Sequence, residues 1–348
     1  MKKMKTEDAV GQILCHDITQ IIPGVTKDAV FRKGHVIREE DIPVLLSVGK
    51  DHIYIWENNE NMLHENEAAE ILYRFCGNKN MSPGAVKEGK IEVIAECDGL
   101  LKVDRKKLNA LNHLGEMMIA SRHGNFPVKK GDKIAGTRII PLVIEKEKMR
   151  RAEEVCKGDP IFELKPFVHK KVGIVTTGNE VYHRRIEDAF TPVLKEKLAE
   201  YDTEIIGHRI SDDNPERVTG FIMELLDLGA DLILCSGGMS VDPDDKTPLA
   251  IKNTGADIVS YGAPVLPGAM FMLAYYQVTE GENPRTVAIM GLPGCVMYAK
   301  RTIFDLVLPR VMADDQVTAE ELAALGQGGL CLNCPVCTFP NCGFGKGV

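Results

Sequence analysis

The sequence of 348 residues lacks the features of several large protein classes. It has no excess of positive charge, because 42 Lys and Arg residues stand against 50 Asp and Glu residues. With a formal net charge of -8 it lacks the positive field that attracts a phosphate polymer, and we expect no nucleic-acid partner. It also has no long apolar run after its charged N-terminus, which argues against a signal peptide or a membrane span and predicts a cytoplasmic protein.

Aromatic residues are few, at 6% with a single Trp, but apolar residues reach 44% of the chain. That content supports ordinary packed cores and excludes disorder as the main state, and the length allows two or three domains. Four of the ten cysteines lie within the last 18 residues. A disulfide framework would spread its cysteines more evenly, so this clustering predicts metal chemistry in a reducing compartment.

The first half of the chain predicts two β-rich parts. Residues 1–57 read as a small unit in which a strand, a turn at Gly34, a short helix ended by Gly49 and a second strand follow one another between residues 29 and 56. Residues 58–156 read as an α+β region, and residues 157–160 as a linker. The α+β region is expected to contain helices over residues 66–75, 105–117 and 145–154 and strands over residues 91–97, 100–103 and 133–144.

After Lys170 strands and helices alternate, which is typical of an α/β fold with a mostly parallel sheet and helices on both faces. We expect this domain over residues 170–312, followed by a cysteine-rich, metal-binding tail over 326–348. Pro215 suits the first turn of one helix. The expected strands are 172–176, 203–210, 231–235 and 286–290, and the expected helices are 187–201, 215–228 and 294–308.

Three of these strands end in turns of small residues: Thr176–Glu180, Ser236–Ser240 and Gly291–Gly294. In a parallel sheet such turns gather at the carboxyl edge, where ligands bind. Glycine lets the backbone approach an anion closely, and free N–H groups at a helix start favour negative charge. A single turn of this kind is often only a tight connection, but three together predict a phosphorylated small molecule as ligand.

Acidic residues accompany these turns. Carboxylates beside a phosphate repel it unless a divalent cation bridges the two, and Mg²⁺ commonly does so with one or two carboxylates. The alternative is that Asp212 and the 242–245 segment cap the helices that follow them, because Asp is a favoured N-cap residue. The residues concerned are Glu180, Asp212, Asp213, Asp242, Asp244 and Asp245.

Five segments of the C-terminal half resemble, in the same order, the motifs of molybdopterin-binding domains. Such domains occur in molybdopterin molybdenumtransferases, molybdopterin adenylyltransferases and competence-damage-inducible proteins. The resemblance covers residues 171–310 and implies a three-layer molybdopterin-binding domain with a mostly parallel sheet, preceded here by the β-rich α+β region. The segments are 176–180, 211–215, 236–245, 265–271 and 291–294.

The resemblance implies a site for molybdopterin, or adenylylated molybdopterin, with Mg²⁺ and with molybdate or tungstate as the second substrate. Glu180, Asp212 and Asp245 would handle the metal or molybdate as catalytic residues. The cofactor-binding residues that it implies are Thr176, Thr177, Gly178, Ser236, Gly237, Gly238, Ser240, Pro267, Gly268, Gly291, Pro293 and Gly294.

The sequence departs from the molybdenumtransferase pattern beside Pro267. That pattern has a lysine on each side of the Pro-Gly pair, where this chain has Leu266 and Ala269. Since two cations that could meet an anion are lost, two functions remain open: a molybdenumtransferase-like enzyme, and a non-catalytic pterin carrier, chaperone or sensor that serves a molybdoenzyme client. A nucleotide pyrophosphatase is a third alternative, and a homodimer is open. Cys295 stands where the family often has Asn, and we expect it to pack as a small apolar residue.

The four cysteines of the tail, Cys331, Cys334, Cys337 and Cys342, are separated by two, two and four residues. Two intervening residues let neighbouring thiolates face one ion or cluster, as in ferredoxin-type and zinc-knuckle loops. No His lies in the segment, and we favour a 4Fe–4S cluster over Zn²⁺. The alternative is a flexible tail with free thiols. In either case we expect the tail to be a tethered appendage.

Overall fold

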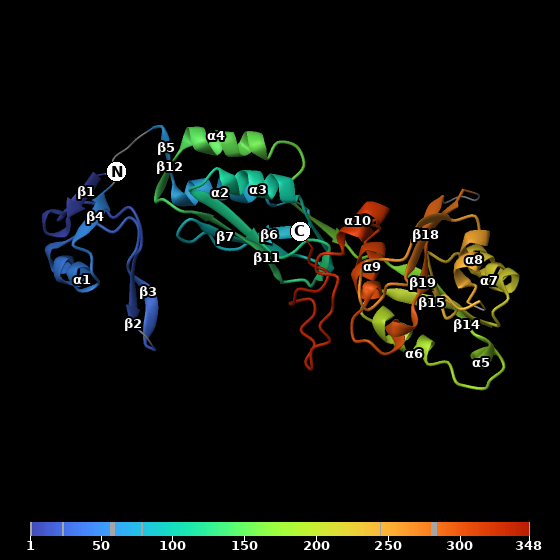
Figure 1. Ribbon diagram of the computed structural model, residues 1–348. Coiled ribbons are helices and arrows are strands. Elements are labelled where there is room, and N and C mark those ends of the chain that lie inside the picture. The colour runs from blue at the N-terminus through green and yellow to red at the C-terminus, as the bar shows by residue number, and fades with distance from the viewer. Residues whose placement is uncertain are drawn as a thin grey trace. The chain divides into compact units, whose positions relative to one another are not determined.

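A computed structural model describes residues 2–22, 24–55, 60–77, 79–243, 245–279 and 284–347 (Figure 1). The chain folds into two compact units. The first consists of residues 1–96, 103–122 and 130–163, and the second of residues 97–102, 123–129 and 164–348. No described helix has both the length and the apolar character needed to cross a membrane.

The N-terminal part of the first unit is a small β-rich cluster. Strand β1 (Lys2–Lys5) pairs antiparallel with β4 (His52–Ile55), and β2 (Ile18–Ile22) pairs antiparallel with β3 (Thr26–Phe31). Helix α1 (Ile42–Ser47) lies between β3 and β4 in the sequence, which confirms the predicted order of strand, turn, helix and strand. Trp56, the predicted end of the last strand, lies outside the described residues. The buried core includes Leu14, Ile18, Ile37, Leu45 and Ile53.

The rest of the first unit is an antiparallel sheet with three helices. Its order is β6 (Met81–Pro83), β7 (Lys90–Ala95), β11 (Lys133–Ile139) and β9 (Met117–Ser121). Residues 133–144 do not form one strand as predicted, because the chain leaves the sheet after Ile139 and a second strand, β12 (Val143–Glu145), pairs with β5 (Met62–His64). The helices are α2 (Glu65–Arg74), α3 (Arg105–His113) and α4 (Lys146–Val155).

The second unit is an α/β domain around a six-stranded sheet of order β15-β14-β16-β19-β18-β17. Strands β15, β14, β16 and β19 pair in parallel, whereas β18 runs antiparallel to both of its neighbours, β19 and β17. The predicted mostly parallel sheet is therefore confirmed. The strands are β14 (Lys170–Thr177), β15 (Thr203–Ser211), β16 (Leu232–Ser236), β17 (Asp257–Tyr261), β18 (Met272–Val278) and β19 (Arg285–Leu292).

Helices cover both faces of this sheet because its central strands are apolar on both sides. Val172 and Ile174 of β14 join one core with helices α6 (Phe190–Leu198) and α9 (Ile303–Met312). Val175, one position further on, joins a second core with α7 (Pro215–Asp227) and α8 (Thr247–Asn253). Figure 1 shows α7 and α8 on the opposite side of the sheet from α6 and α9. The unit thus has three layers.

Two helices of this unit begin later than predicted. The helix predicted over 187–201 begins at Phe190, since Asp188 accepts hydrogen bonds from the N–H groups of Phe190 and Thr191 (2.9 and 3.1 Å). The helix predicted from residue 294 is wrong over its first half. A 3₁₀ turn (Gly294–Met297) comes first, and α9 begins at Ile303 with Thr302 as N-cap. Residues 298–302 are therefore a loop rather than part of a helix.

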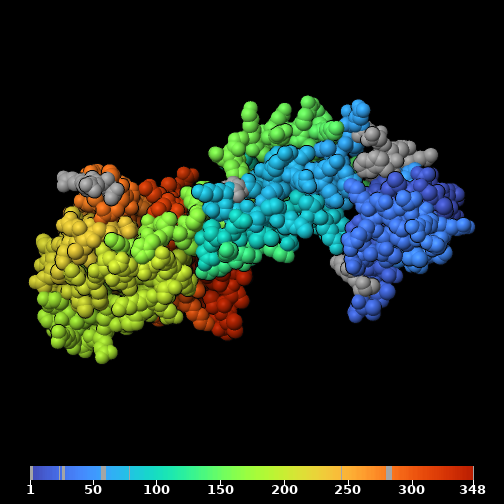
Figure 2. Space-filling view, turned by 180° about the vertical axis from the view of Figure 1, so that it is seen from behind, coloured from blue at the N-terminus to red at the C-terminus, as the bar shows by residue number. Residues whose placement is uncertain are grey.

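The tail, residues 326–347, folds back onto the second unit after α10 (Ala319–Ala324). Phe344 is 5% exposed and belongs to the same core as α6 and α9. The N–H of Cys331 donates to the carbonyl of Leu266, and the N–H of Leu266 donates to the carbonyl of Gly329 (2.8 Å each). Figure 2 shows the C-terminal segment, in red, as part of the surface of this unit. The expectation of a tethered appendage is wrong, because an aromatic side chain and main-chain bonds dock the tail.

A separate small sheet consists of β8 (Gly99–Val103), β10 (Phe126–Val128) and β13 (Phe162–Pro166).

Candidate functional site

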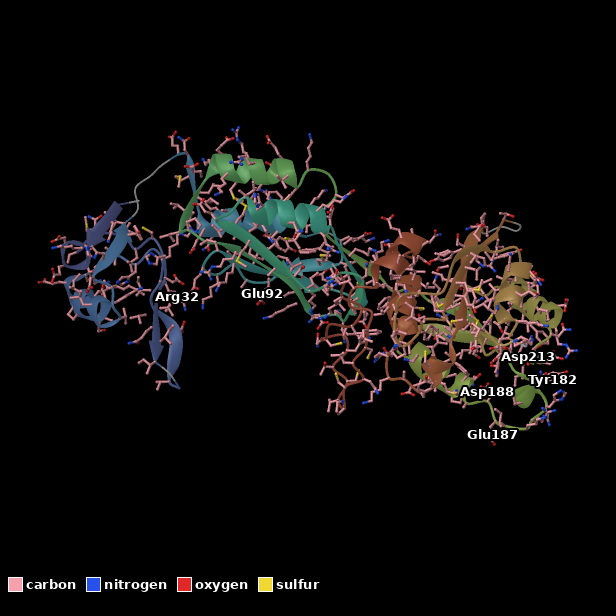
Figure 3. All side chains as sticks on the ribbon, viewed as in Figure 1. Arg32, Glu92, Tyr182, Glu187, Asp188 and Asp213 are labelled. Carbon is pink, nitrogen blue, oxygen red and sulfur yellow. The ribbon has the colours of Figure 1, made fainter. Side chains whose placement is uncertain are left out.

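Three loops leave the same edge of the six-stranded sheet. In the sheet register Thr176 is level with Ser236, and Ser236 is level with Leu292. Residues 178–180, 237–240 and 293–295 follow these three strand ends, and we call them the strand-end loops. Figure 3 labels Tyr182, Asp188 and Asp213, which lie around helix α5 (Asn179–Tyr182) in this part of the unit. The predicted meeting of the three turns is confirmed by the strand register.

Two glycines hold the second loop against the end of β14. Gly237 has φ +87° and Gly238 has φ +58°. A Cβ at Gly237 would lie 2.1 Å from the carbonyl oxygen of Thr177, and one at Gly238 would lie 2.7 Å from Oγ1 of Thr247. Only glycine fits such spacing and such φ angles. The loop therefore keeps its backbone, rather than side chains, at the sheet edge.

The remaining glycines of the predicted site differ in role. Gly268 (φ +131°) and Gly291 are both buried. A Cβ at Gly268 would lie 2.4 Å from Cγ2 of Ile303, and a Cβ at Gly291 would lie 2.6 Å from the side chain of Met239. They serve close packing inside the unit. Gly294, by contrast, is exposed with open space around it. Pro267 is half-buried and Pro293 is buried, so Gly294 is the member of this group that faces outward.

The hydroxyl groups at the strand ends lie beneath the loops. Thr176 and Ser236 are buried, and their hydroxyl oxygens are 3.4 Å apart. Oγ1 of Thr176 also lies 3.0 Å from Nε2 of His208. Oγ1 of Thr177 lies 3.0 Å from that of Thr247 and donates to the carbonyl of Ser236 (3.3 Å). These hydroxyl groups therefore bond to one another and to neighbouring groups at the strand ends, and they brace the loops that follow.

Sequence reasoning missed two members of this network, Asp188 and His208. Asp188 accepts the hydroxyl hydrogen of Thr191 (2.5 Å) and lies 3.5 Å from Nε2 of His208. Burial raises the pKa of Asp188, but the bonds from Thr191 and Phe190 outweigh it and the pKa is lowered. Burial lowers the pKa of His208. The spacing of Asp188 and Thr191 before a helix is a capping signal, whereas nothing in the sequence marked His208.

The structure brings the predicted carboxylates together. Asp213 accepts the N–H of Asn179 (3.1 Å), and its pKa is raised by burial and by the negative charges of Glu180, Asp245 and Asp212. A carboxyl group whose pKa neighbouring carboxylates raise lies within a negative field. This field occurs next to the first two strand-end loops. Asp242 is exposed, and Asp244 lies outside the described residues.

The capping alternative is wrong for Asp212 and Asp245, whereas Asp244 lies outside the described residues. Asn214, not Asp212, caps α7, since its side chain accepts the N–H of Arg217 (2.9 Å). Asp212 instead pairs with the guanidinium of Arg217 (3.1 Å). Asp245 accepts the N–H of Ser240 (2.9 Å) and so braces its own loop. Over the described ranges, no three His, Cys, Asp or Glu side chains are grouped so as to hold a metal ion.

The departures from the family pattern lie on the same unit. Leu266 and Ala269 are both exposed and uncharged. Cys295 is half-buried, and burial raises the pKa of its thiol, which keeps the thiol protonated at neutral pH. That favours the expected packing role over a thiolate at the ligand.

The four cysteines of the tail line one cavity of about 510 Å³. Cys331 and Cys342 are half-buried, and Cys334 and Cys337 are exposed. Pro267, predicted as a cofactor-binding residue, lines the same cavity. The structure therefore joins the tail to a loop of the α/β domain, which sequence reasoning had treated separately.

Family models match two parts of the chain. Residues 173–313 match a model described as a probable molybdopterin binding domain. Residues 3–57 match a model described as a domain of unknown function. The first match contains most of β14, the other five strands of its sheet, all three strand-end loops and the Pro267–Gly268 pair.

Similar proteins cover limited parts of the chain. A CinA-like protein of Mycobacterium avium (strain 104) is 38% identical over 80 residues, which are 23% of this chain and 18% of that protein. The chain thus matches less than a fifth of that relative's length. Among solved structures, the molybdopterin biosynthesis enzyme MoaB from Thermus thermophilus is 21% identical at a TM-score of 0.31, covering 40% of this chain and 91% of that one. CinA from Thermoplasma acidophilum is 15% identical at a TM-score of 0.33, covering 41% and 98%.

The region that matches the family model also contains the five motifs and the strand-end loops built on them. Residues 173–313 of this chain are a domain of the molybdopterin-binding family of molybdenum cofactor biosynthesis.

Proposed function

We propose that the second unit binds molybdopterin by its phosphate at the strand-end loops and acts in molybdenum cofactor biosynthesis. The observation that carries this is the placement of Gly237 and Gly238 against the ends of β14 and α8, where a Cβ would collide. Backbone N–H groups held at the carboxyl edge of parallel strands are a recurrent way to bind phosphate. The match of residues 173–313 to the family model supports molybdopterin as the ligand that carries this phosphate.

The carboxylates beside the loops are oxygen donors of the kind that Mg²⁺ prefers. The described residues hold no preformed group of three such ligands, so these side chains would have to move onto the ion as it binds. Glu180, Asp212 and Asp245 would hold it, with Asp213 as a fourth oxygen donor. The raised pKa of Asp213 reflects the field that such a cation would neutralise. When bound, the ion would screen the charge of a phosphate from the carboxylates. The chain's own residues orient this site, because the bond from the N–H of Ser240 holds Asp245 and the bond from the N–H of Asn179 holds Asp213.

The reaction that we propose is the one the molybdenumtransferase resemblance implies. Water or a molybdate oxygen attacks the phosphoanhydride of adenylylated molybdopterin and breaks its P–O bond, so that AMP leaves. The dithiolene sulfurs then replace oxygen ligands of molybdate or tungstate, and the displaced oxygen leaves as water with the protons of the thiols. In this proposal the strand-end loops orient the pterin phosphate, and the carboxylates hold the cation that meets it.

A second candidate is a carrier that binds molybdopterin without turnover and delivers it to a molybdoenzyme client. Leu266 and Ala269 favour it, since neither can make a charge-assisted bond to phosphate or molybdate. The N–H and carbonyl of Leu266 are moreover occupied by bonds to the tail (2.8 Å each). That loop is thus built for contact with the tail rather than for anion binding.

Anaerobic binding and turnover of adenylylated molybdopterin distinguish the two candidates. The enzyme predicts AMP release that requires Mg²⁺ and molybdate and is abolished in Asp245→Ala. Asp242→Ala, an exposed carboxylate of the same loop, is the matched control and should release AMP as the wild type does. Binding without AMP release would reject the enzyme and support the carrier. Failure to bind either form of the pterin would reject both.

A further inference from the structure

The cavity of the tail has walls from three segments that are distant in sequence. Besides the four cysteines, it is lined by Pro267, by residues 298–301 and by the aromatic rings of Phe339 and Phe344. Its volume is about 510 Å³. The thiols are the metal-binding side chains in this lining, because it contains no His, Asp or Glu. Any group held here by side chains is therefore held by sulfur.

Main-chain bonds fix the first and last cysteines. The N–H of Cys331 donates to the carbonyl of Leu266, and the N–H of Leu266 donates to the carbonyl of Gly329, each at 2.8 Å. At the other end, Phe344 is buried two residues after Cys342. A Cβ at Gly345 would lie 2.4 Å from Leu306, so the chain passes close against α9. Cys331 and Cys342 are thereby held on a packed surface.

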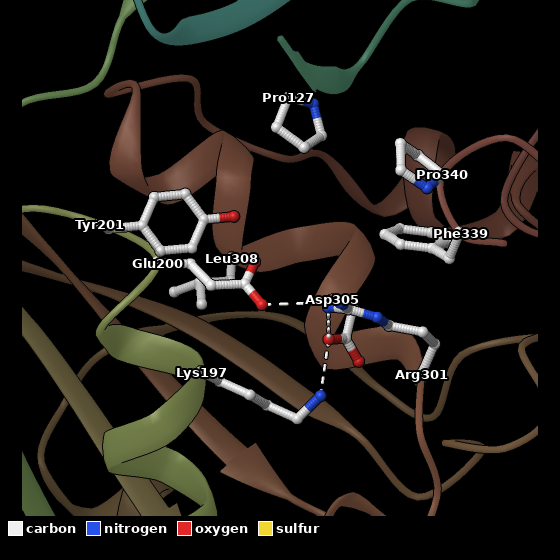
Figure 4. A pocket seen from close by; sticks show the side chains of 9 residues that line it. All are labelled: Pro127, Lys197, Glu200, Tyr201, Arg301, Asp305, Leu308, Phe339 and Pro340. Carbon is white, nitrogen blue, oxygen red and sulfur yellow. Dashed lines mark hydrogen bonds and ion pairs between the residues drawn. The ribbon is translucent and has the colours of Figure 1, made fainter. Parts of the chain in front are cut away.

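Two cations stand beside the exposed middle of the tail. Nζ of Lys300 donates to the carbonyls of Cys334 and Pro335 (3.3 and 2.8 Å). The guanidinium of Arg301 lies over the ring of Phe339, 5.0 Å from its centroid. Asp305 holds Arg301 in place at 2.9 Å (Figure 4). Positive charge is thus fixed at the wall of a cavity whose ligands would be thiolates.

The size of the cavity favours a cluster over a single ion. A single zinc ion needs its four sulfurs to converge within about 2.3 Å of one point. In the part of the chain that the structure describes, no three His, Cys, Asp or Glu side chains are already grouped to hold a metal ion, so the tail cysteines would close around the group as it binds. The four cysteines line a cavity of about 510 Å³, far larger than one zinc ion fills. Cys₄ ligation around a larger body is the arrangement of iron–sulfur clusters. Four thiolates on an oxidised four-iron core leave a net negative charge, and Lys300, whose Nζ bonds to the carbonyls of Cys334 and Pro335, places a positive charge beside it.

We propose that the tail holds one four-iron, four-sulfide cluster in this cavity, bound by Cys331, Cys334, Cys337 and Cys342. Each thiol gives up its proton as its sulfur bonds to one iron. The cluster lies directly beside the Leu266–Pro267 loop, on the surface where the family pattern would have a lysine. It stabilises the docked tail by joining the exposed cysteines to the two that main-chain bonds already fix. The site does not depend on pterin binding.

Reconstitution of the full chain with equal amounts of ferrous and ferric iron and with sulfide, under anaerobic conditions, supplies the two ferric and two ferrous irons of the oxidised core and tests the proposal without any pterin. We expect about four irons and four acid-labile sulfides per chain, with a visible absorption that bleaches on reduction by dithionite. Cys334→Ser combined with Cys337→Ser should reduce the iron content at least tenfold. Both side chains are exposed, so this variant should fold. Circular dichroism and the melting temperature of the metal-free proteins check that it does.

Cys97→Ser is the matched control, since Cys97 is a half-buried cysteine of the same unit that lies outside the tail. It should retain the full iron and sulfide content. Stoichiometric zinc with no iron, or four free thiols after reconstitution, would overturn the proposal. An equal loss of iron in Cys97→Ser would also overturn it, because the iron would then be bound without specificity.

Discussion

The strand-end loops and the cysteine tail, both in the second unit, are built in opposite ways. The loops follow strands of one sheet, and Gly237 and Gly238 press their backbone onto neighbouring main-chain and hydroxyl atoms. The tail has no regular element among its described residues after α10. It is held by side chains such as Phe344, Lys300 and Arg301, together with main-chain bonds to Leu266. The comparison teaches that a site made of backbone needs glycine and a rigid sheet. A site made of side chains needs partners from elsewhere in the chain.

The largest effect should come from the ion pairs beneath the tail. Asp305 is 7% exposed and bonds to Lys197 (2.6 Å) and Arg301 (2.9 Å) (Figure 4). Asp305→Ala leaves two cations without this partner, and we expect the free energy of unfolding to fall by about 4 kcal/mol. Urea denaturation followed by circular dichroism measures it. Glu200→Ala removes an exposed partner of the same Arg301 and should cost under about 1 kcal/mol. Equal losses in the two variants would show that burial of the pair is irrelevant.

The next effect compares one glycine from each region. Gly237→Ala places a Cβ 2.1 Å from the carbonyl oxygen of Thr177, at φ +87°, and should lower the free energy of unfolding by about 3 kcal/mol. Gly345→Ala places a Cβ 2.4 Å from Cδ2 of Leu306, at φ +75°. That atom ends a flexible side chain, and the cost should be about 1 kcal/mol. Gly345→Ala should also speed proteolysis of the tail, and Gly237→Ala should not. A larger loss in Gly345→Ala would contradict the contrast between rigid backbone and mobile side chain.

The smallest effect is a difference in pH dependence. Burial raises the pKa of Asp315, but hydrogen bonds from Lys102 and Lys165 and the charge of Arg310 outweigh it and lower the pKa to about 2. Its stabilisation is complete above the unfolded pKa of about 4 and disappears as the pH falls through the folded pKa, a loss of roughly 2 kcal/mol. Asp213, beside the strand-end loops, has a raised pKa. Its protonation at falling pH relieves repulsion, so its contribution changes in the opposite sense.

Two variants separate these contributions. Asp315→Asn should be less stable than the wild type at neutral pH and should lose less stability between pH about 4 and about 2. Asp213→Asn should lose more stability than the wild type as acid is added, because the relief of repulsion is absent. Urea midpoints measured across this range provide the comparison. Parallel pH profiles for the wild type and Asp315→Asn would mean that protonation of Asp315 does not change the free energy of unfolding.

Much of the second unit could be predicted from its sequence. Alternating apolar strands and helices predicted the parallel sheet, and the glycines after β14 and β16 predicted loops at one edge. The prediction failed in two different ways. Residues 298–302 follow a helix-like pattern, but Thr302 and Asp305, three residues apart, form a capping box that starts α9 only at Ile303, a local signal that the prediction overlooked. His208 shows no local signal, because its partners Thr176 and Asp188 lie 32 and 20 positions away along the chain.

The sequence by itself determined the order of elements, the glycines of the loops, the carboxylates and the spacing of the four cysteines, since these depend on periodicity and on neighbours along the chain. Only the tertiary structure decided that the tail packs as part of the second unit and that Leu266, where the family has a cation, is bonded to Cys331. The reason is physical. Burial of Phe344 and the pairing of backbone groups from residues 266 and 331 depend on surfaces that exist only once the sheet has assembled.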